Sequence, residues 1–314
     1  DMSYMFAISK ATSLDLSKFD TSNVTDMSYM FSLSKATMIN VSSFNTSKVT
    51  NMQSMFNSVL ASQLNLSSFD TSNVTDMERM FLKSKITNLD VSKFKTSKVT
   101  TMRGMFDETE TTTIDVSGFD TRNVTDMSYM FSQTKATNVD VSKFKTSKVV
   151  NMSAMFNDCP TTTINVSGFD TRNVTDMSYM FSRTKATSID VSKFNTSKVT
   201  SMAGMFYLSS FSKVNTSGFD TRNVTDMSHM FRDSLITDID VSRFNTSKVT
   251  NMNAIFSVCK ATTIDVSKFD TSNVTDMTSM FRGTIATTID VSKFDTSKVT
   301  SMAGMFHSVY APTV

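Results

Sequence analysis

Apolar residues recur along the chain at fixed positions of a 25-residue repeat. Phe19 opens the first complete repeat, and a Phe stands at every twenty-fifth residue from there to Phe294. Counted from that Phe as position 1, Met occupies positions 9 and 12, except where Ile255 replaces one, and a second Phe occupies position 13. An uninterrupted period of this length is typical of a solenoid, in which each repeat is one coil stacked on the next. We therefore expect each position to meet the same surroundings in every repeat.

Two segments of the repeat carry patterns typical of secondary structure. Positions 18–23, as in ATSLDL (residues 11–16), alternate apolar with polar residues and favour Val and Ile, which predicts a short strand with one buried face. Positions 6, 9, 12 and 13, as in VTDMSYMF (residues 24–31), have the spacing of one face of a short helix or 3-10 segment. Asn23 and Asp26 suit the start of such a helix.

The fold expected from these elements is a repeat solenoid, with one short parallel strand and one short helical or 3-10 segment per 25-residue coil. Residues 1–314 are expected to form a single array of about twelve repeats, truncated at both ends because Asp1 and Val314 fall inside repeats. The strict period predicts that Met at positions 9 and 12 and Phe at positions 1 and 13 are buried in columns. In one irregular repeat, we expect Phe211 to fill volume that Thr216, in place of Val, leaves empty.

The pattern A-x-x-L-x-L-x-x-F, as in ATSLDLSKF (residues 11–19), followed by V-T-x-M-x-x-M-F, resembles the BspA-like surface-protein repeat, the 26-residue type of bacterial surface repeat. That family is grouped with the leucine-rich repeats, so the resemblance implies a right-handed leucine-rich-repeat-like stack on secreted or surface-anchored bacterial proteins that act in adhesion. Leucine-rich repeats usually carry an Asn ladder after the strand, whereas position 1 here is Phe, so a coil closer to a β-helix is an alternative. Cys is frequent near position 16 in that family, and Cys159 and Cys259 stand there.

Charge and residue types narrow the possible functions. The 31 basic and 29 acidic residues nearly balance, and no run of like charge predicts nucleic-acid binding. Apolar runs do not reach membrane-spanning length, and the first residues lack the pattern of a signal peptide.

His229 and His307 lie about three repeats apart. Cys159 and Cys259 lie four repeats apart, roughly 19 Å by strand spacing, which is too far for a disulfide in a straight stack. No metal motif or phosphate loop is present, so we expect no catalytic residue, cofactor or metal site.

Two columns of polar side chains are the candidate ligand-facing residues. At position 22 an acidic column alternates outward from the strands, and at position 5 Asn in one repeat alternates with Lys in the next, which adds a 50-residue period. The purely structural interpretation is that this alternation sets how the repeats stack and their register, because like charges in neighbouring repeats repel. The other is that the columns contact a ligand. The candidate residues are Asp90, Asp115, Asp140, Asp190, Asp240, Asp265, Lys98, Lys148, Lys198, Asn123 and Asn173.

These observations favour a non-catalytic module, secreted or on the cell surface, that acts as a rigid spacer and adhesive surface. The expected partner is a protein or glycan of a host or neighbouring cell, and end-to-end self-association is a further possibility. The alternative is a ladder that binds calcium or ice. The acidic column offers oxygen ligands for Ca²⁺, and Thr at positions 3 and 7 forms a regular array of the kind that ice-binding proteins present.

Overall fold

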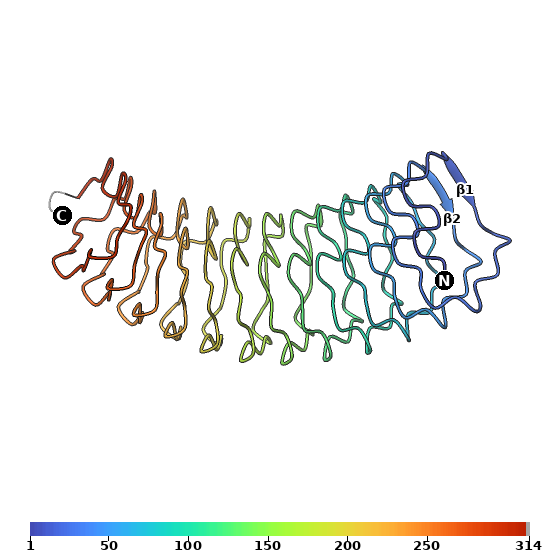
Figure 1. Cartoon of the computed structure of the whole chain (residues 1–314), viewed down its shortest axis with the longest axis horizontal. Helices are drawn as coiled ribbons and strands as arrows, with labels where there is room; N and C mark the ends of the chain where they lie inside the picture. The colour runs from blue at the N-terminus through green and yellow to red at the C-terminus, as the bar shows by residue number, and fades with distance from the viewer. Residues whose placement is uncertain (312–314) are drawn as a thin grey trace. The chain divides into compact units, whose positions relative to one another are not determined.

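The computed structural model describes residues 1–311, which fall into two compact units. Unit 1 comprises residues 1–149 with 159–161, and unit 2 comprises residues 150–158 together with the chain from residue 162 onward. Both units have the same internal construction, in which successive 25-residue repeats lie side by side (Figure 1). The expectation of one array over the whole chain stays a prediction.

The chain has a repetitive, non-helical fold. Within residues 1–311 the regular elements are two short strands, and no helix is present. Strands β1 (Ser13–Asp15) and β2 (Met38–Asn40) pair in parallel with Leu14 opposite Ile39, one repeat apart (Figure 1). In later repeats the same segment keeps its alternating burial but makes at most a single parallel bridge, such as Lys213 to Asp238. The strand prediction is therefore confirmed as an extended segment, and as a paired strand only at the start of unit 1.

The prediction of a short helix or 3-10 segment over positions 6–13 is wrong. Residues at positions 11 and 15 have positive φ in every described repeat, as at Tyr29 (56°) and Leu33 (59°). Amides alternate in their partners: the Tyr29 N–H donates to the carbonyl of Gln53 in the next repeat, whereas the Met30 N–H donates back to Met27. A helix keeps such bonds within its own segment. Here half of them join neighbouring repeats, and the same apolar spacing serves a series of turns.

The buried columns of Met and Phe are confirmed. Every Met at positions 9 and 12 from Met27 to Met280 is fully buried, and so is every position-13 Phe from Phe31 to Phe281. The position-13 rings stack face to face, with ring centroids 5.4 Å apart at Phe31–Phe56 and 5.8 Å apart at Phe256–Phe281. Position-1 Phe side chains are buried from Phe44 to Phe269. Burying each such side chain stabilises the fold by about 1.5–3 kcal/mol.

A threonine ladder at position 3 satisfies the backbone inside both units. The Thr96 hydroxyl donates to the carbonyl of Asp120 (3.1 Å) and accepts the N–H of the same residue (2.7 Å), so one side chain pairs both backbone groups of a residue in the next repeat. Thr221 does the same for Asn245 in unit 2. These Thr residues are buried, and they lie two positions after the Phe at position 1, which stands in place of the Asn ladder of leucine-rich repeats.

The irregular repeat packs as predicted in one respect. Phe211 is fully buried, with its ring edge-on to Phe181 and Phe206, and Thr216 is buried as well. The Thr216 hydroxyl donates to the backbone carbonyl of Asp240 at 2.7 Å. The idea that Phe211 compensates for the smaller Thr216 stays a prediction, because the ring contacts the position-13 Phe column.

Candidate functional site

The acidic column at position 22 is exposed, and each carboxylate holds its own turn. Asp90 Oδ1 accepts the backbone N–H (3.0 Å) and the hydroxyl (2.6 Å) of Ser92, and these two bonds lower the pKa of Asp90. Asp115, Asp140, Asp190, Asp240 and Asp265 accept the N–H of the Ser two residues later in the same way. Such Asx turns are a local structural role for Asp. Contact of this column with a ligand stays a prediction.

The lysine–asparagine column at position 5 links neighbouring repeats. Lys98 Nζ donates to Asn73 Oδ1 (2.6 Å), and Asn73 Nδ2 donates to the carbonyl of Ser47 (2.7 Å), so one Lys–Asn pair connects three repeats. Lys148 with Asn123 and Lys198 with Asn173 form the same contact, at 2.7 Å each. The 50-residue period therefore alternates a donor with an acceptor. This geometry supports the stacking interpretation, while the Lys side chains stay exposed.

The two Thr columns differ in exposure. From Thr21 to Thr271 the position-3 Thr residues are buried, so they cannot form one half of an ice-facing array. Most position-7 Thr residues are exposed, and their hydroxyls donate to the position-7 carbonyl of the preceding repeat, as from Thr75 to Thr50 (3.1 Å). One exposed Thr column remains on the surface, whereas the alternative function of ice binding requires a flat array of such columns.

The sequence interpretation missed a charged cluster in unit 1. The chain has three Glu residues, Glu78, Glu108 and Glu110, and all of them lie within two neighbouring repeats. Arg79 and Arg103 occupy the same repeats, Arg79 at position 11, which elsewhere holds an uncharged residue or His, and Arg103 at position 10, which elsewhere is mostly Ser or Ala. A cluster of residue types that are rare elsewhere in a repetitive chain is the signal that would have identified this region.

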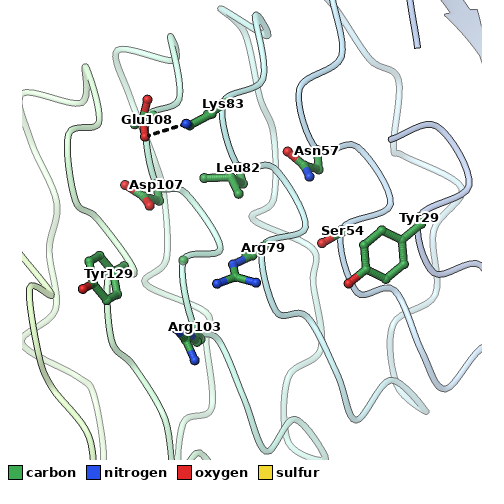
Figure 2. A pocket seen from close by; sticks show the side chains of 11 residues that line it. Tyr29, Ser54, Asn57, Arg79, Leu82, Lys83, Arg103, Asp107, Glu108 and Tyr129 are labelled. Atoms are coloured by element: carbon green, nitrogen blue, oxygen red, sulfur yellow. Dashed lines mark ion pairs between the residues drawn. The ribbon is translucent and has the colours of Figure 1, made fainter. Parts of the chain in front are cut away.

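These charged side chains line a groove of about 410 Å³ on unit 1. Tyr29 and Tyr129 stand at its two ends, and Figure 2 shows the side chains of Arg79 and Arg103 between them. Both Tyr residues occupy position 11, where the intervening repeats carry Ser54, Arg79 and Gly104. Small residues at two of these places leave the column recessed between the two rings. Asn57, Leu82, Lys83, Asp107 and Glu108 complete the lining.

A glycine sets the position of Arg79. Gly104 has a φ of +57°, and a Cβ added there would lie 3.3 Å from Arg79 Cγ, so the Arg79 stem rests on the Gly104 backbone. Arg79 also pairs with Glu78 (Nη1–Oε1 3.2 Å). Across the groove Lys83 pairs with Glu108 (Nζ–Oε1 3.2 Å; Figure 2). Such partly exposed pairs contribute little stability, about 0–1 kcal/mol each, and leave the side chains free to meet a ligand.

Two groove-lining residues have buried polar atoms without a hydrogen bond in the described structure, Arg103 Nε and Asp107 Oδ1. Burial raises the pKa of Asp107 to about 6, against the opposing effect of the Ser132 hydroxyl. A buried polar atom without a partner costs about 1–3 kcal/mol. The groove thus combines aromatic rings, guanidinium donors and a carboxyl group of raised pKa, a set suited to binding a polar ligand.

Comparison with known families gives five overlapping matches to the family described as "Mycoplasma protein of unknown function, DUF285". They cover residues 1–113, 102–218, 132–240, 156–264 and 208–312, and so nearly the whole chain. The chain belongs to the DUF285 family. Its overlapping matches reflect the tandem repeats of the sequence, and the family description assigns no function. Curated proteins and solved structures gave no match to the chain.

The remaining candidate residues of this DUF285 chain lie in ordinary surroundings. His229 lies beside Arg232 (Nδ1–Nη1 3.5 Å), and His307 Nδ1 contacts the Ser308 hydroxyl (3.1 Å). Cys159 and Cys259 are both buried, and burial raises the pKa of the Cys259 thiol. From residue 1 to residue 311, no three His, Cys, Asp or Glu side chains gather as a metal site. Nor does that part of the DUF285 chain contain a helix able to span a membrane.

Proposed function

We propose that this DUF285 chain is a non-catalytic module of a bacterial cell surface, acting as a spacer and as an adhesive surface for a protein or glycan. The observation that supports this role most directly is the lysine–asparagine column, which repeats an exposed, hydrogen-bonded pair every 50 residues within each unit. Surface position rests on the resemblance to the BspA-like repeat. Under this proposal the chain has no substrate to turn over.

The architecture proposed for this role is a right-handed, leucine-rich-repeat-like solenoid. Parallel bridges at one-repeat intervals, such as Asp76 to Thr101 in unit 1 and Asp226 to Asn251 in unit 2, support stacked coils. The position-3 threonine ladder supports the leucine-rich-repeat likeness, because it pairs the backbone inside each turn as an Asn ladder would. The helical segment of such repeats is replaced here by turns.

Repetition gives this proposal its energetic basis. A weak contact made by one Lys–Asn pair recurs at fixed spacing, so later contacts form at high effective concentration. Avidity of this kind exceeds a single affinity by about 10²–10⁴. Binding should then decline stepwise as pairs are removed, because no single pair is indispensable.

The test replaces the position-5 lysines by Gln one after another in the full chain and measures binding to immobilised glycans and extracellular host proteins. The residues are Lys48, Lys98, Lys148, Lys198, Lys248 and Lys298. A graded loss supports the proposal. The matched series replaces six exposed lysines at position 25 and removes the same charge: Lys18, Lys93, Lys143, Lys193, Lys268 and Lys293. Equal loss in both series, or loss at one substitution only, contradicts a role for the column.

A further inference from the structure

Two side chains that line the groove on unit 1 each contain a buried polar atom without a hydrogen-bond partner. Arg103 Nε is a donor and Asp107 Oδ1 is an acceptor when ionised, and both are buried in side chains that line the groove. Satisfying both requires a ligand that carries acceptors and donors close together. Hydroxyl groups provide both functions on one atom.

The charge of the groove favours an anion when Asp107 is protonated. Three cationic side chains, Arg79, Lys83 and Arg103, face two carboxyl groups, Asp107 and Glu108. Lys83 pairs with Glu108 and Arg79 pairs with Glu78, which leaves the Arg103 guanidinium group and the Asp107 carboxyl group, and that carboxyl group is uncharged below a pH of about 6. Figure 2 shows Arg79 and Arg103 at the centre of the groove between the two Tyr rings. Guanidinium groups bind carboxylates through paired, parallel hydrogen bonds.

Size and aromatic walls restrict the ligand further. A volume of about 410 Å³ lies in the range of small-ligand sites, too small for a folded partner. Tyr129 is 40 % exposed, and its ring offers a flat apolar face with a polar tip. Leu82 is the one aliphatic side chain of the lining, so pockets for the apolar side chains of a peptide are missing among these residues. A ring that is polar at its edge and apolar on its face fits this combination.

We propose that this groove binds a short acidic saccharide, with its carboxylate held by Arg79 and Arg103 and a sugar ring packed on Tyr129. The site goes beyond the proposed adhesive surface, because its residues lie outside the lysine–asparagine column. Uronic and sialic acids carry the same carboxylate on a sugar ring, so the groove chemistry fits both sources.

Asp107 makes binding depend on pH. Its carboxyl group lies among Lys83, Arg79, Glu108 and Ser132, and burial raises its pKa to about 6. Above that pH the ionised carboxylate repels an acidic ligand, and below it the protonated group can donate a hydrogen bond. We expect tighter binding at pH 5.5 than at pH 8.

The experiment titrates the full chain with a hyaluronan tetrasaccharide and with sialyllactose, and compares neutral chitotetraose and an acetylated hexaglutamate peptide. Binding of either acidic sugar, and of neither control, supports the proposal and identifies the source of the carboxylate. Arg79→Gln and Arg103→Gln should each weaken binding by about 10- to 100-fold, the usual effect of losing a charge-assisted hydrogen bond. The control Arg122→Gln, an exposed Arg of the same unit paired with Asp120, should leave affinity unchanged.

Three ligand-binding results would each overturn the proposal: equal binding of the neutral sugar, tighter binding of the peptide, or no binding of either acidic sugar. Unchanged affinity in Arg79→Gln would do the same, and this partly exposed residue decides the question if Arg103→Gln proves unstable in a thermal melt. Loss of sugar binding in the Arg variants, with the stepwise effect of the position-5 lysines absent, would contradict the adhesive column alone. The two proposals therefore fail independently.

Discussion

At the scale of single residues, each buried methionine belongs to a column in which neighbouring repeats carry Met at the same position, except at Ile255. Met130 is fully buried, whereas Met38, the one Met outside the two columns, is 62 % exposed. Truncating Met130 leaves a cavity that stacked repeats on both sides keep open. We expect Met130→Ala to lower the free energy of unfolding by about 2–5 kcal/mol. Met38→Ala should change it by less than about 0.5 kcal/mol. Equal effects in chemical denaturation would refute the column assignment.

The raised pKa of Asp107 predicts that the free energy of unfolding depends on pH. Its folded-state pKa is raised to about 6 from an ordinary value of 3.8, so the folded chain holds this proton more tightly than the unfolded chain does. Stability therefore falls as pH rises from about 4 through 6. Asp107→Asn removes that penalty, and we expect it to stabilise the protein at pH 8 by on the order of 1 kcal/mol after solvent screening, and not at pH 4.

The matched control for Asp107 is Asp190, an aspartate whose pKa is shifted in the opposite direction. Hydrogen bonds from Ser192 lower the pKa of exposed Asp190, so its ionised form is favoured in the folded chain. That contribution is present above the ordinary pKa and is lost as pH falls. Asp190→Asn should therefore not stabilise the protein at pH 8. Denaturant midpoints of both variants at pH 4 and pH 8 make the comparison, and parallel pH profiles for the two would contradict the argument.

Residue-level prediction from the sequence succeeded for the apolar columns and failed for the groove. Phe31 and Met130 recur strictly, so their burial follows from the period alone. Arg79, Arg103 and Asp107 depart from the period, and a repeat-averaged interpretation treats such departures as surface variation. Their convergence depends on side chains from neighbouring repeats meeting across Gly104, which a one-dimensional pattern does not show.

At the scale of elements, the turn segment shows why apolar spacing alone was misleading. Spacings of three and four residues fit a helix, and they fit turns with left-handed residues at positions 11 and 15 equally well. Glycine usually marks such residues, but here Tyr29, Ala254 and Val258 adopt the conformation. The hydrogen bonds to the next repeat hold them there, and a single repeat considered alone cannot reveal those bonds.

The left-handed backbone conformation is unfavourable at Val258. It has a φ of 53°, a conformation that is strained for a β-branched residue. Its side chain is 37 % exposed, so removing it sacrifices little burial. We expect Val258→Gly to raise the free energy of unfolding by about 1 kcal/mol. Val150→Gly, at an exposed Val with ordinary φ in the same unit, should lower it by about 0.5–1 kcal/mol. Thermal melts that show both variants destabilised would refute the strain argument.

The threonine ladder is the second element that can be tested directly. Thr96→Val keeps the shape of the side chain but leaves the Asp120 N–H and carbonyl without their partner. We expect a loss of roughly 1–3 kcal/mol in unfolding free energy. Thr75→Val, at exposed position 7 of the same unit, should cost less than about 0.5 kcal/mol, because the Thr75 N–H still pairs with the Thr50 carbonyl. Similar losses in both variants would show that position 3 has no special role.

At the scale of the molecule, the sequence predicted the repetitive organisation because a strict period constrains every repeat at once. It did not predict the division into two units, since Val150 and the residues around it keep the period without a gap. Within a unit, hydrogen bonds and ring stacks connect residues about 25 apart, as in the pairs Thr196–Asp220 and Phe206–Phe231. Each repeat of a unit is therefore stabilised mainly by its two neighbours.

Nearest-neighbour stabilisation gives a prediction about pairs of substitutions in unit 2. Thr196 bonds to the Asp220 backbone in the repeat that also contains Thr221, whereas Thr271 lies three repeats from Thr196. We expect the changes in unfolding free energy caused by Thr196→Val and Thr271→Val to add within about 0.3–0.5 kcal/mol, as they do for distant sites. Thr196 and Thr221 lie in neighbouring repeats joined by the Thr196–Asp220 bond, so Thr196→Val and Thr221→Val should deviate from additivity by about 0.5 kcal/mol or more. The two double-mutant cycles, measured by chemical denaturation, test this directly. Strong coupling between the distant pair would show that the unit responds as one continuous core rather than as neighbouring repeats.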